Sequence, residues 1–263
     1  MLTAWDVEDK IYAWAPKEYR MDWDNTGLLC GRQDREVRRI LVALDPTFDV
    51  CEEAAEVGAD LLVTHHPLIF QPLKCVTDQD AAGKALLYLI GHDIAAINAH
   101  TNLDQAVGGV NDCLAEILGL RDIEVPSPCG MDPAGRPWGL LRCGNVDEMP
   151  LREFAAAVKE KLACSGLRFL DSERPVRRVA VGGGACADEL ETVRAAGCDT
   201  FVTADVKYHQ FQDALNMGIN LIDAGHFETE NPICRRLAEY LRRSFPETEV
   251  VLSKKHGDPV QFI

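Results

Sequence analysis

An internal repeat constrains the fold of this chain more than any other feature. Residues Val37–Val42 (VRRILV) match Val176–Val181 (VRRVAV), and at the same offset Gly58–Thr64 (GADLLVT) matches Gly197–Thr203 (GCDTFVT). Each copy predicts a strand, a turn, a helix that ends at a glycine, and a second strand. This order of elements is a βαβ unit, whose two strands are parallel. We therefore predict an α/β fold of two related halves with mainly parallel sheets.

A second pattern follows each βαβ unit. An apolar strand, over residues 94–99 in the first half and 221–225 in the second, ends at a histidine, and an acidic residue follows four positions later. One such pattern is weak, but its presence in both halves argues against coincidence. The two pairs are His100 with Asp104 and His226 with Glu230.

A stretch rich in proline, glycine and aspartate, residues 121–137, separates the two copies and predicts a linker or a long loop. We expect a first half over residues 1–125 and a second half over residues 126–263, with the C-terminal segment able to pack back on the first half. The other expected elements are a strand at 139–143, a helix at 151–162, a helix at 232–245, and a strand pair at 250–253 and 260–263.

Composition excludes several classes of protein. The net charge of −15 opposes direct binding to nucleic acid, which needs a basic surface. Every apolar run is far too short to cross a bilayer, and the N-terminus shows no signal peptide, so we expect a cytoplasmic protein that does not bind membranes. The ten cysteines are scattered without a Cys-x-x-Cys motif and are expected to be reduced thiols.

Two adjacent histidines, His65 and His66, follow the second strand of the first predicted βαβ unit. Functional groups gather at the carboxyl ends of strands in open α/β sheets. Adjacent side chains that leave a strand point in different directions. The pair therefore suits two neighbouring metal ions, or one ligand and one supporting residue, better than a single ion. The alternative is a turn with two surface histidines.

Imidazole and carboxylate groups thus converge from three strand ends. Without thiolates they suit zinc, iron, manganese, cobalt or nickel and disfavour a structural zinc site. Six donors are too many for one tetrahedral ion with an open position, but they suit two ions about 3.5–4 Å apart. We predict a dinuclear centre in the cleft between the halves, bridged by the two carboxylates. Its ligands are His65, His66, His100, Asp104, His226 and Glu230.

The second half carries Ala204 and Asp205 where the first has its adjacent histidines, and a Lys-Tyr-His sequence follows. His209 and Glu230 are the candidate catalytic residues, with His209 moving protons. Lys207 is a candidate substrate contact for an anionic group. The alternatives are a histidine that opens a helix packed on the core, and a surface lysine.

Two polar or glycine-rich loops complete the candidates. Asp24 and Asn25 either contact substrate in the cleft or shape a turn with Gly27. The glycines at 182–184 lie between a strand and a helix, where a loop can bind phosphate. The motif is neither of the established phosphate-binding patterns, and a tight turn is the alternative.

Five motifs together resemble the Nif-three-like family, many of whose members are named type 2 GTP cyclohydrolase homologues. The resemblance covers nearly the whole chain in order and is to the short form, without an inserted domain. It implies a dinuclear metal centre whose ligand positions match the six residues above, and a toroidal homohexamer. The motifs are Trp23–Leu28, Thr64–Phe70, Asn98–Asp104, Asp205–His209 and Ile222–Glu230.

The first functional hypothesis is a metal-dependent hydrolase of a small, nucleotide-like substrate, with two divalent transition metal ions (zinc, iron or manganese) in each subunit. GTP cyclohydrolase chemistry is compatible with such a site. The second hypothesis is a non-catalytic, metal-binding regulatory or scaffold protein. A third is a phosphoesterase that acts on nucleic-acid ends.

Overall fold

A computed structural model describes all 263 residues and divides the chain into two compact units. Unit 1 comprises Met1–Ala106 and Ile233–Gly257, and unit 2 comprises Val107–Pro232 and Asp258–Ile263. The fold is mixed α/β. None of its helices has the length and apolar character needed to cross a membrane.

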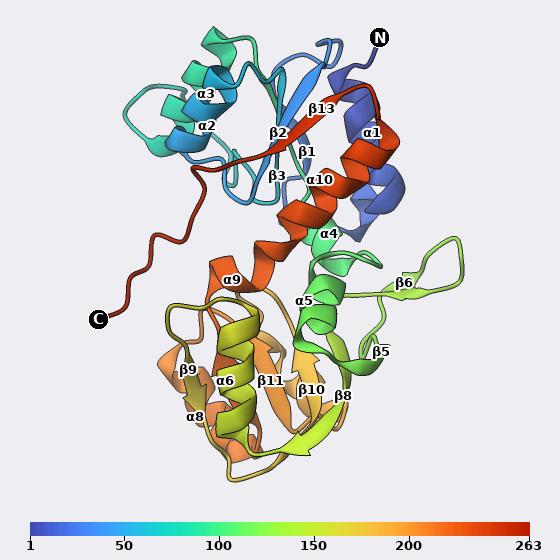
Figure 1. The fold of residues 1–263 in the computed structure, drawn as a ribbon, viewed down its shortest axis with the longest axis vertical. Coiled ribbons are helices and arrows are strands. Elements are labelled where there is room, and N and C mark those ends of the chain that lie inside the picture. Colours follow the sequence, from blue (N-terminus) through green and yellow to red (C-terminus); the bar gives the residue numbers. More distant parts are fainter. The chain divides into compact units, whose positions relative to one another are not determined.

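Unit 1 is built on a five-stranded sheet of order β1-β4-β3-β2-β13, drawn in the upper part of Figure 1. β1 is antiparallel to β4, and the other neighbouring strands are parallel. The strands are β1 (Gly27–Cys30), β2 (Arg39–Ala43), β3 (Leu61–Thr64), β4 (Ala95–Asn98) and β13 (Glu249–Leu252). The helices are α1 (Ala4–Trp14), η1 (Lys17–Tyr19), α2 (Phe48–Glu56), α3 (Ala81–Gly91), α4 (Thr101–Gln105) and α10 (Pro232–Ser244).

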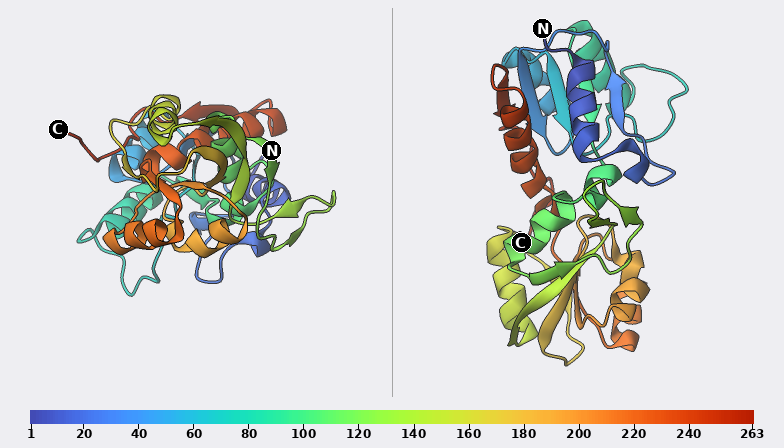
Figure 2. Two further views of the ribbon diagram at one scale, coloured as in Figure 1. Left: turned by 90° about the horizontal axis from the view of Figure 1, so that it is seen from below. Right: turned by 90° about the vertical axis from the view of Figure 1, so that its right-hand side faces the viewer.

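Helices cover both faces of this sheet (Figures 1 and 2). α2 and α3 pack on one face, where Leu41 and Leu62 alternate with residues that point to the other side. α1 and α10 lie over that opposite face, and α10 presents Leu237 and Leu241 from its buried side. With both faces covered, the central strands are buried along their whole length, and their sequences are continuous apolar runs.

Unit 2 is built on a six-stranded sheet of order β5-β8-β10-β11-β12-β9. Only β10, β11 and β12 are mutually parallel. The strands are β5 (Arg121–Glu124), β8 (Arg142–Met149), β9 (Arg168–Leu170), β10 (Val176–Val181), β11 (Thr200–Thr203) and β12 (Asn220–Asp223), with a separate hairpin of β6 (Gly130–Met131) and β7 (Pro137–Trp138). The helices are α5 (Val110–Leu118), α6 (Leu151–Lys161), η2 (Ala187–Glu189), α7 (Leu190–Ala195), α8 (Tyr208–Met217) and α9 (His226–Glu230).

Two apolar cores lie on the two faces of the second sheet. α5 and α6 pack on the face formed by alternate residues such as Val179 and Val202. α7 and α8 pack on the other face, against Ala180 and Phe201. Figure 1 shows α6 in front of this sheet and α8 behind it.

The repeated βαβ unit is confirmed in both units. β2 and β3 are parallel around α2, and β10 and β11 are parallel around α7. Gly58 and Gly197 follow the ends of these helices with φ of +67° and +70°, the left-handed conformation that ends a helix most easily at glycine. The helices expected at 151–162 and 232–245 and the strand expected at 250–253 are also confirmed, within a few residues.

The prediction of mainly parallel sheets is wrong for unit 2. β5, β8 and β9 are antiparallel to their neighbours, because they come from residues 121–170, outside the repeated βαβ unit. The expected linker at 121–137 contains three short strands, and residues 260–263 form no strand. The N-terminal segment of unit 1 ends at Ala106, because α5 packs its apolar side on the core of unit 2. All ten cysteines are free thiols, as expected.

Candidate metal centre

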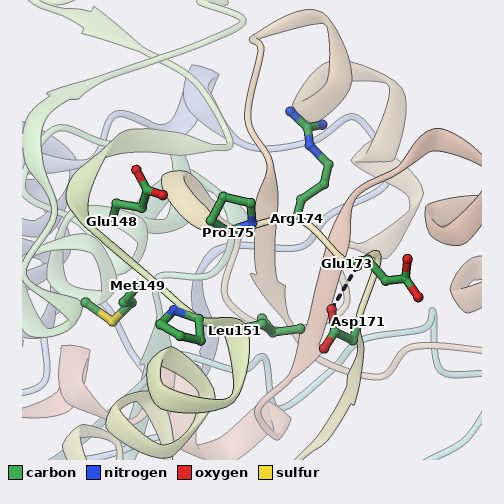
Figure 3. Close-up of a pocket in the computed structure, with 8 residues that line it drawn as sticks. Glu148, Met149, Leu151, Asp171, Glu173, Arg174 and Pro175 are labelled. Atoms are coloured by element: carbon green, nitrogen blue, oxygen red, sulfur yellow. Dashed lines mark hydrogen bonds between the residues drawn. The ribbon is translucent and has the colours of Figure 1, made fainter.

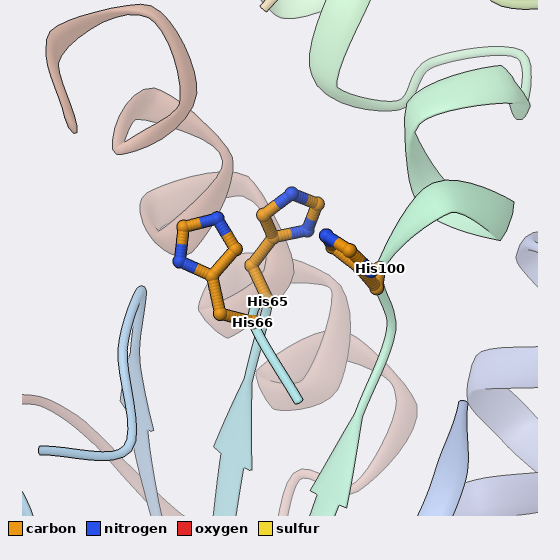
Figure 4. Close-up of side chains that lie close together, drawn as sticks. All are labelled: His65, His66 and His100. Atoms are coloured by element: carbon orange, nitrogen blue, oxygen red, sulfur yellow. The ribbon is translucent and has the colours of Figure 1, made fainter. Parts of the chain in front are cut away.

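Three histidines gather at the carboxyl edge of the sheet in unit 1. His65 and His66 follow β3 directly, and His100 lies between β4 and α4. Their ring centroids are 5.0, 5.3 and 5.6 Å apart, and one nitrogen of each lies within 4.8 Å of the others. Figure 4 shows the three rings converging from two neighbouring strand ends. The prediction that these three residues follow the ends of strands is thus confirmed.

Each of these rings is held through its Nδ1 atom. The partners are the Ala99 carbonyl for His65 (2.8 Å), Asp45 for His66 (2.6 Å) and Asp24 for His100 (2.7 Å). A carbonyl or an ionised carboxylate only accepts hydrogen bonds, so Nδ1 carries the proton in each ring. In the neutral tautomer the lone pair is then on Nε2, the atom that could bind a metal. Such anchoring by an oxygen is typical of metal-binding histidines.

Asp24 makes several bonds with the start of α4. Besides His100, its carboxylate accepts hydrogen bonds from the backbone N–H of Thr101 (3.0 Å) and from the Thr101 hydroxyl. Burial opposes ionisation, but the hydrogen bond and charge of His100 and the two bonds from Thr101 outweigh it. Together they lower the pKa of Asp24 to about 2. Asp24 is therefore a fully charged anchor at neutral pH.

The backbone of the Asp24 loop is also tied down. The Asn25 side-chain amide donates to the Ile69 carbonyl (2.8 Å), and the Asn98 amide donates to the Asn25 carbonyl (3.0 Å). In this structure the Asp24 and Asn25 side chains thus bond to the protein itself. That they contact substrate stays a prediction.

Asp104 adds a carboxylate to the histidine cluster. α4 is a short helix that begins directly after His100, so Asp104 lies about one helical turn beyond His100. Its Oδ1 is 3.4 Å from Nε2 of His65. Unit 1 therefore offers three imidazoles and one carboxylate as metal donors in one place.

His226 and Glu230 form the equivalent pair in unit 2. They are the first and last residues of α9, and the i, i+4 spacing brings His226 Nε2 within 3.0 Å of Glu230 Oε2. The Nδ1 atom of His226 lies 2.7 Å from Asp205, the same arrangement as in unit 1. Asp205 adopts φ +53°, a conformation that is strained for most side chains but accessible to aspartate.

Gly184 allows these two donors to lie close to the backbone of the loop. Its φ is +63°, and a Cβ atom there would collide with Oε1 of Glu230 and lie 3.0 Å from Nε2 of His226. Only glycine fits both the backbone conformation and this close approach. The glycine loop therefore shapes the surroundings of the metal donors.

The three glycine N–H groups of the same loop donate to the protein itself. Gly182 donates to the Val202 carbonyl (3.0 Å), Gly183 to Asn111 Oδ1 (2.7 Å) and Gly184 to Thr229 Oγ1 (3.0 Å). A phosphate-binding loop needs such groups directed at its ligand. The alternative of a tight turn between strand and helix is the one that the structure supports.

Lys207 and His209 lie at the start of α8, where both are exposed. Their roles in substrate binding and proton transfer stay predictions.

The sequence did not predict that three aspartates bond to the candidate histidine ligands. Asp45 was not singled out, although it follows β2 at the same sheet edge; Asp24 and Asp205 were considered, but not as histidine partners. His256 supports the same region: its Nδ1 accepts a hydrogen bond from the Leu44 N–H (3.0 Å), and burial lowers its pKa. An acidic residue just after a strand was the available signal for Asp45.

Unit 2 has two hollows that are candidate substrate sites. One, of about 460 Å³, is lined by Glu148 and Arg174 among others (Figure 3). It lies where β10 begins, away from the carboxyl ends of the parallel strands β10, β11 and β12, and has no histidine or cysteine. The other, of about 290 Å³, adjoins His226 and is lined by Phe227, Arg168 and several carboxylates. Only the second lies beside a metal donor.

Comparison with known proteins gives a consistent result. A family profile described as Duf34/NIF3 (NGG1p interacting factor 3) matches residues 2–259. A Clostridium perfringens protein named GTP cyclohydrolase 1 type 2 homolog is 34% identical over 261 residues, 98% of both chains. A Streptomyces coelicolor protein of the same name is 40% identical over 253 residues, 93% of this chain and 88% of that protein.

Solved structures agree with the sequence matches. A Bacillus cereus protein related to NIF3 superposes with a TM-score of 0.94 at 27% identity, over 100% of this chain and 99% of the other. A hypothetical protein from Staphylococcus aureus superposes with a TM-score of 0.91 at 30% identity, over 99% of each chain.

Proposed function

The chain belongs to the Duf34/NIF3 family, and we propose that it is a metal-dependent hydrolase of a small, nucleotide-like substrate. The observation that carries the proposal is shared by all four candidate histidine ligands. Each has its Nδ1 bonded to an oxygen, which directs Nε2 toward a metal. Such anchoring in both units is not expected of histidines that serve only packing.

We propose further that two divalent transition metal ions share the donors of both units in one centre. The donor chemistry supports this: imidazole and carboxylate without thiolate suit zinc, iron or manganese. The proposed ligands are His65, His66, His100, Asp104, His226 and Glu230, with the two carboxylates as bridges.

When bound, such ions polarise the substrate and lower the pKa of water, which is the chemistry that hydrolysis at neutral pH requires. The protein's own residues perform the other tasks. Asp24, Asp45 and Asp205 hold the ligand rings in one tautomer and orientation. The hollow beside His226 has room for a small substrate. His209 is proposed to move protons and Lys207 to bind an anionic group.

Metal analysis of the purified protein tests the centre. We expect about two transition metal ions per chain, and a lower content in His65→Ala. His92→Ala is the matched control, because His92 stacks on Tyr88 at the end of α3, away from the cluster. Fewer than one ion per chain, with no difference between the two variants, would overturn the metal centre.

A substrate screen tests catalysis separately. The metal-loaded protein is assayed for hydrolysis of nucleotides, including GTP, and of phosphoesters, with Glu230→Ala as the inactive control. Turnover above that control supports the hydrolase. Normal metal content without turnover of any compound would favour the non-catalytic, metal-binding role instead.

The resemblance of the sequence motifs to the family also leads us to propose a homo-oligomer, a hexamer. Light scattering after size-exclusion chromatography should then give six times the 29.0 kDa mass of one chain. A monomeric mass at micromolar concentration would overturn this part of the proposal.

A further inference from the structure

Two large aromatic side chains stand exposed beside the histidine cluster of unit 1. Trp23 is 62% exposed and Phe70 is 50% exposed. Their ring centroids are 5.8 Å apart at an interplanar angle of 66°. Exposed aromatic groups that lie together are a common mark of a binding surface.

Both rings also contact a candidate metal ligand. The Trp23 ring is 6.1 Å from the His100 ring at 72°, and the Phe70 ring is 6.3 Å from it at 79°. These are edge-to-face contacts, which leave a face of Trp23 and of Phe70 available to another ring. A planar group stacked there would lie close to His100.

The loops that carry the two aromatic residues are held in place. On one side of Trp23, the Met21 N–H donates to Thr101 Oγ1 (2.9 Å). On the other side, Asp24 is bound to His100 and Thr101, and the Asn25 amide bonds to the Ile69 carbonyl, next to Phe70. Because these hydrogen bonds hold both loops in place, stacking on them would cost little conformational entropy.

Exposure by itself does not distinguish Trp23. Trp5, on α1, is 53% exposed and has no ring partner in this cluster. Trp23 differs from Trp5 because its ring contacts a second exposed aromatic ring and the ring of a candidate metal ligand, His100. Hydrogen bonds also hold the loop on both sides of Trp23.

We propose that Trp23 and Phe70 form a platform for a planar heteroaromatic ring, such as a purine base, which stacks on the Trp23 ring, meets Phe70 at an angle and presents the rest of the ligand to the metal centre. This assignment of the substrate class rests on the proposed metal-dependent hydrolase. The platform recognises a flat π face rather than a hydrogen-bonding edge, so it sets the class of substrate and not one particular base.

Binding of guanosine 5′-monophosphate, measured by calorimetry on metal-loaded protein, tests the platform. We expect wild type to bind it more tightly than ribose 5-phosphate, which lacks the ring. Trp23→Ala should weaken binding at least about ten-fold, equivalent to about 1.4 kcal/mol and within the range for one stacking partner. Phe70→Ala should weaken it in the same direction, and Trp5→Ala should leave it unchanged.

Several outcomes would overturn the platform. These are equal affinity for the nucleotide and for ribose 5-phosphate, equal affinity of the Trp23→Ala and Trp5→Ala variants, or a changed oligomeric mass of Trp23→Ala with unchanged nucleotide binding. The last result would assign the patch to a subunit contact. Trp23→Phe keeps a stacking ring and checks that loss of binding is not loss of folding.

Turnover measured on the same samples separates this proposal from the proposed function. Ring-dependent binding without hydrolysis of any compound leaves the platform standing and removes the hydrolase. Hydrolysis at the same kcat/KM in wild type and Trp23→Ala leaves the hydrolase standing and removes the platform.

Discussion

The Asp24 carboxylate and the His100 ring are joined by a hydrogen bond of 2.7 Å between Oδ1 and Nδ1. The other carboxylate oxygen accepts a bond from the backbone of Thr101, the first residue of α4. One side chain therefore sets both the direction of the ligand ring and the start of the helix that carries Asp104. This coupling makes the metal donors sensitive to a residue that is not itself a donor.

Substitution of Asp24 should weaken metal binding more than it weakens the fold. In Asp24→Asn the side chain keeps its size but loses its charge, so the His100 ring is less basic and less well oriented. We expect metal affinity to fall about 10- to 100-fold, as is typical when the partner of a metal-binding histidine is lost. Competition with a chromogenic chelator measures the change.

Asp22→Asn is the control for this experiment, because Asp22 is exposed and lies only two residues away. Equal metal affinity in the two variants would show that the Asp24–His100 bond does not support the site.

Gly184→Ala should separate backbone strain from crowding of the metal donors. The new Cβ would collide with Glu230 and lie against His226, and the residue would have to keep φ near +63°. We expect a loss of about 1–2 kcal/mol in the free energy of unfolding from the backbone conformation alone. We also expect a large loss of bound metal, measured by elemental analysis.

The matched variant is Gly197→Ala. Gly197 has a similar φ of +70°, but a Cβ there would meet no atom within 4 Å. It should lose similar stability and retain its metal. If both variants kept full metal content, the close approach of Gly184 to Glu230 would have no role in metal binding.

The sequence predicts the repeated parts of this protein well, because their information is local. Apolar runs of strand length and the glycines after the two helices identify both βαβ units. Residues that follow neighbouring parallel strands must lie at the same end of the sheet, so the sequence alone places His65, His66 and His100 together.

The remaining features depend on contacts between residues far apart in the chain. β13 pairs with β2 across about two hundred residues, and no local pattern specifies that neighbour. The Asp45 carboxylate reaches His66 from another strand. Strands β5, β8 and β9 lie outside the repeat and turn a predicted parallel sheet into a mixed one.

Glu53 should make the stability of unit 1 dependent on pH. This buried carboxylate on α2 accepts hydrogen bonds from the Lys254 N–H (2.8 Å), the Lys255 N–H (3.2 Å) and the Ser253 hydroxyl, which follow β13. Burial opposes ionisation, but these bonds and the nearby Lys255 charge outweigh it and lower the pKa of Glu53 below its ordinary 4.5. A lowered pKa in the folded state means that the charged form stabilises the fold.

That stabilisation is complete above pH 4.5 and is lost as the pH falls through the lower, folded-state pKa. At pH 7, Glu53→Gln should reduce the free energy of unfolding by about 1.5–3 kcal/mol, the usual contribution of hydrogen bonds to a charged group. The difference from wild type should shrink as the pH falls below 4.5. Urea denaturation at pH 7 and at low pH measures both effects.

Glu56→Gln is the comparison for Glu53. Glu56 is exposed, and its ion pair with Lys255 at the surface should contribute only about 0–1 kcal/mol. A Glu53→Gln variant no less stable than Glu56→Gln at pH 7 would contradict the role of Glu53.

A buried ion pair in unit 2 gives the last prediction. Arg142 is 1% exposed, and its guanidinium donates two hydrogen bonds to Asp112 (2.7 and 3.0 Å) and two to the carbonyls of Gly139 and Leu141 (2.7 and 3.1 Å). Asp112→Ala leaves the buried cation without its counter-charge, so the free energy of unfolding should fall by ~3–5 kcal/mol. Asp147→Ala removes an exposed partner of Arg121 and should change it by no more than about 1 kcal/mol.

The double variant Asp112→Ala/Arg142→Met distinguishes the loss of a favourable pair from the cost of an unpaired charge. If the unpaired guanidinium is what destabilises Asp112→Ala, replacing it with an apolar side chain should recover a large part of the lost stability. Urea denaturation of the four proteins, followed by circular dichroism, measures these differences. A double variant as unstable as Asp112→Ala would instead show that Arg142 supports unit 2 mainly through its bonds to the two carbonyls.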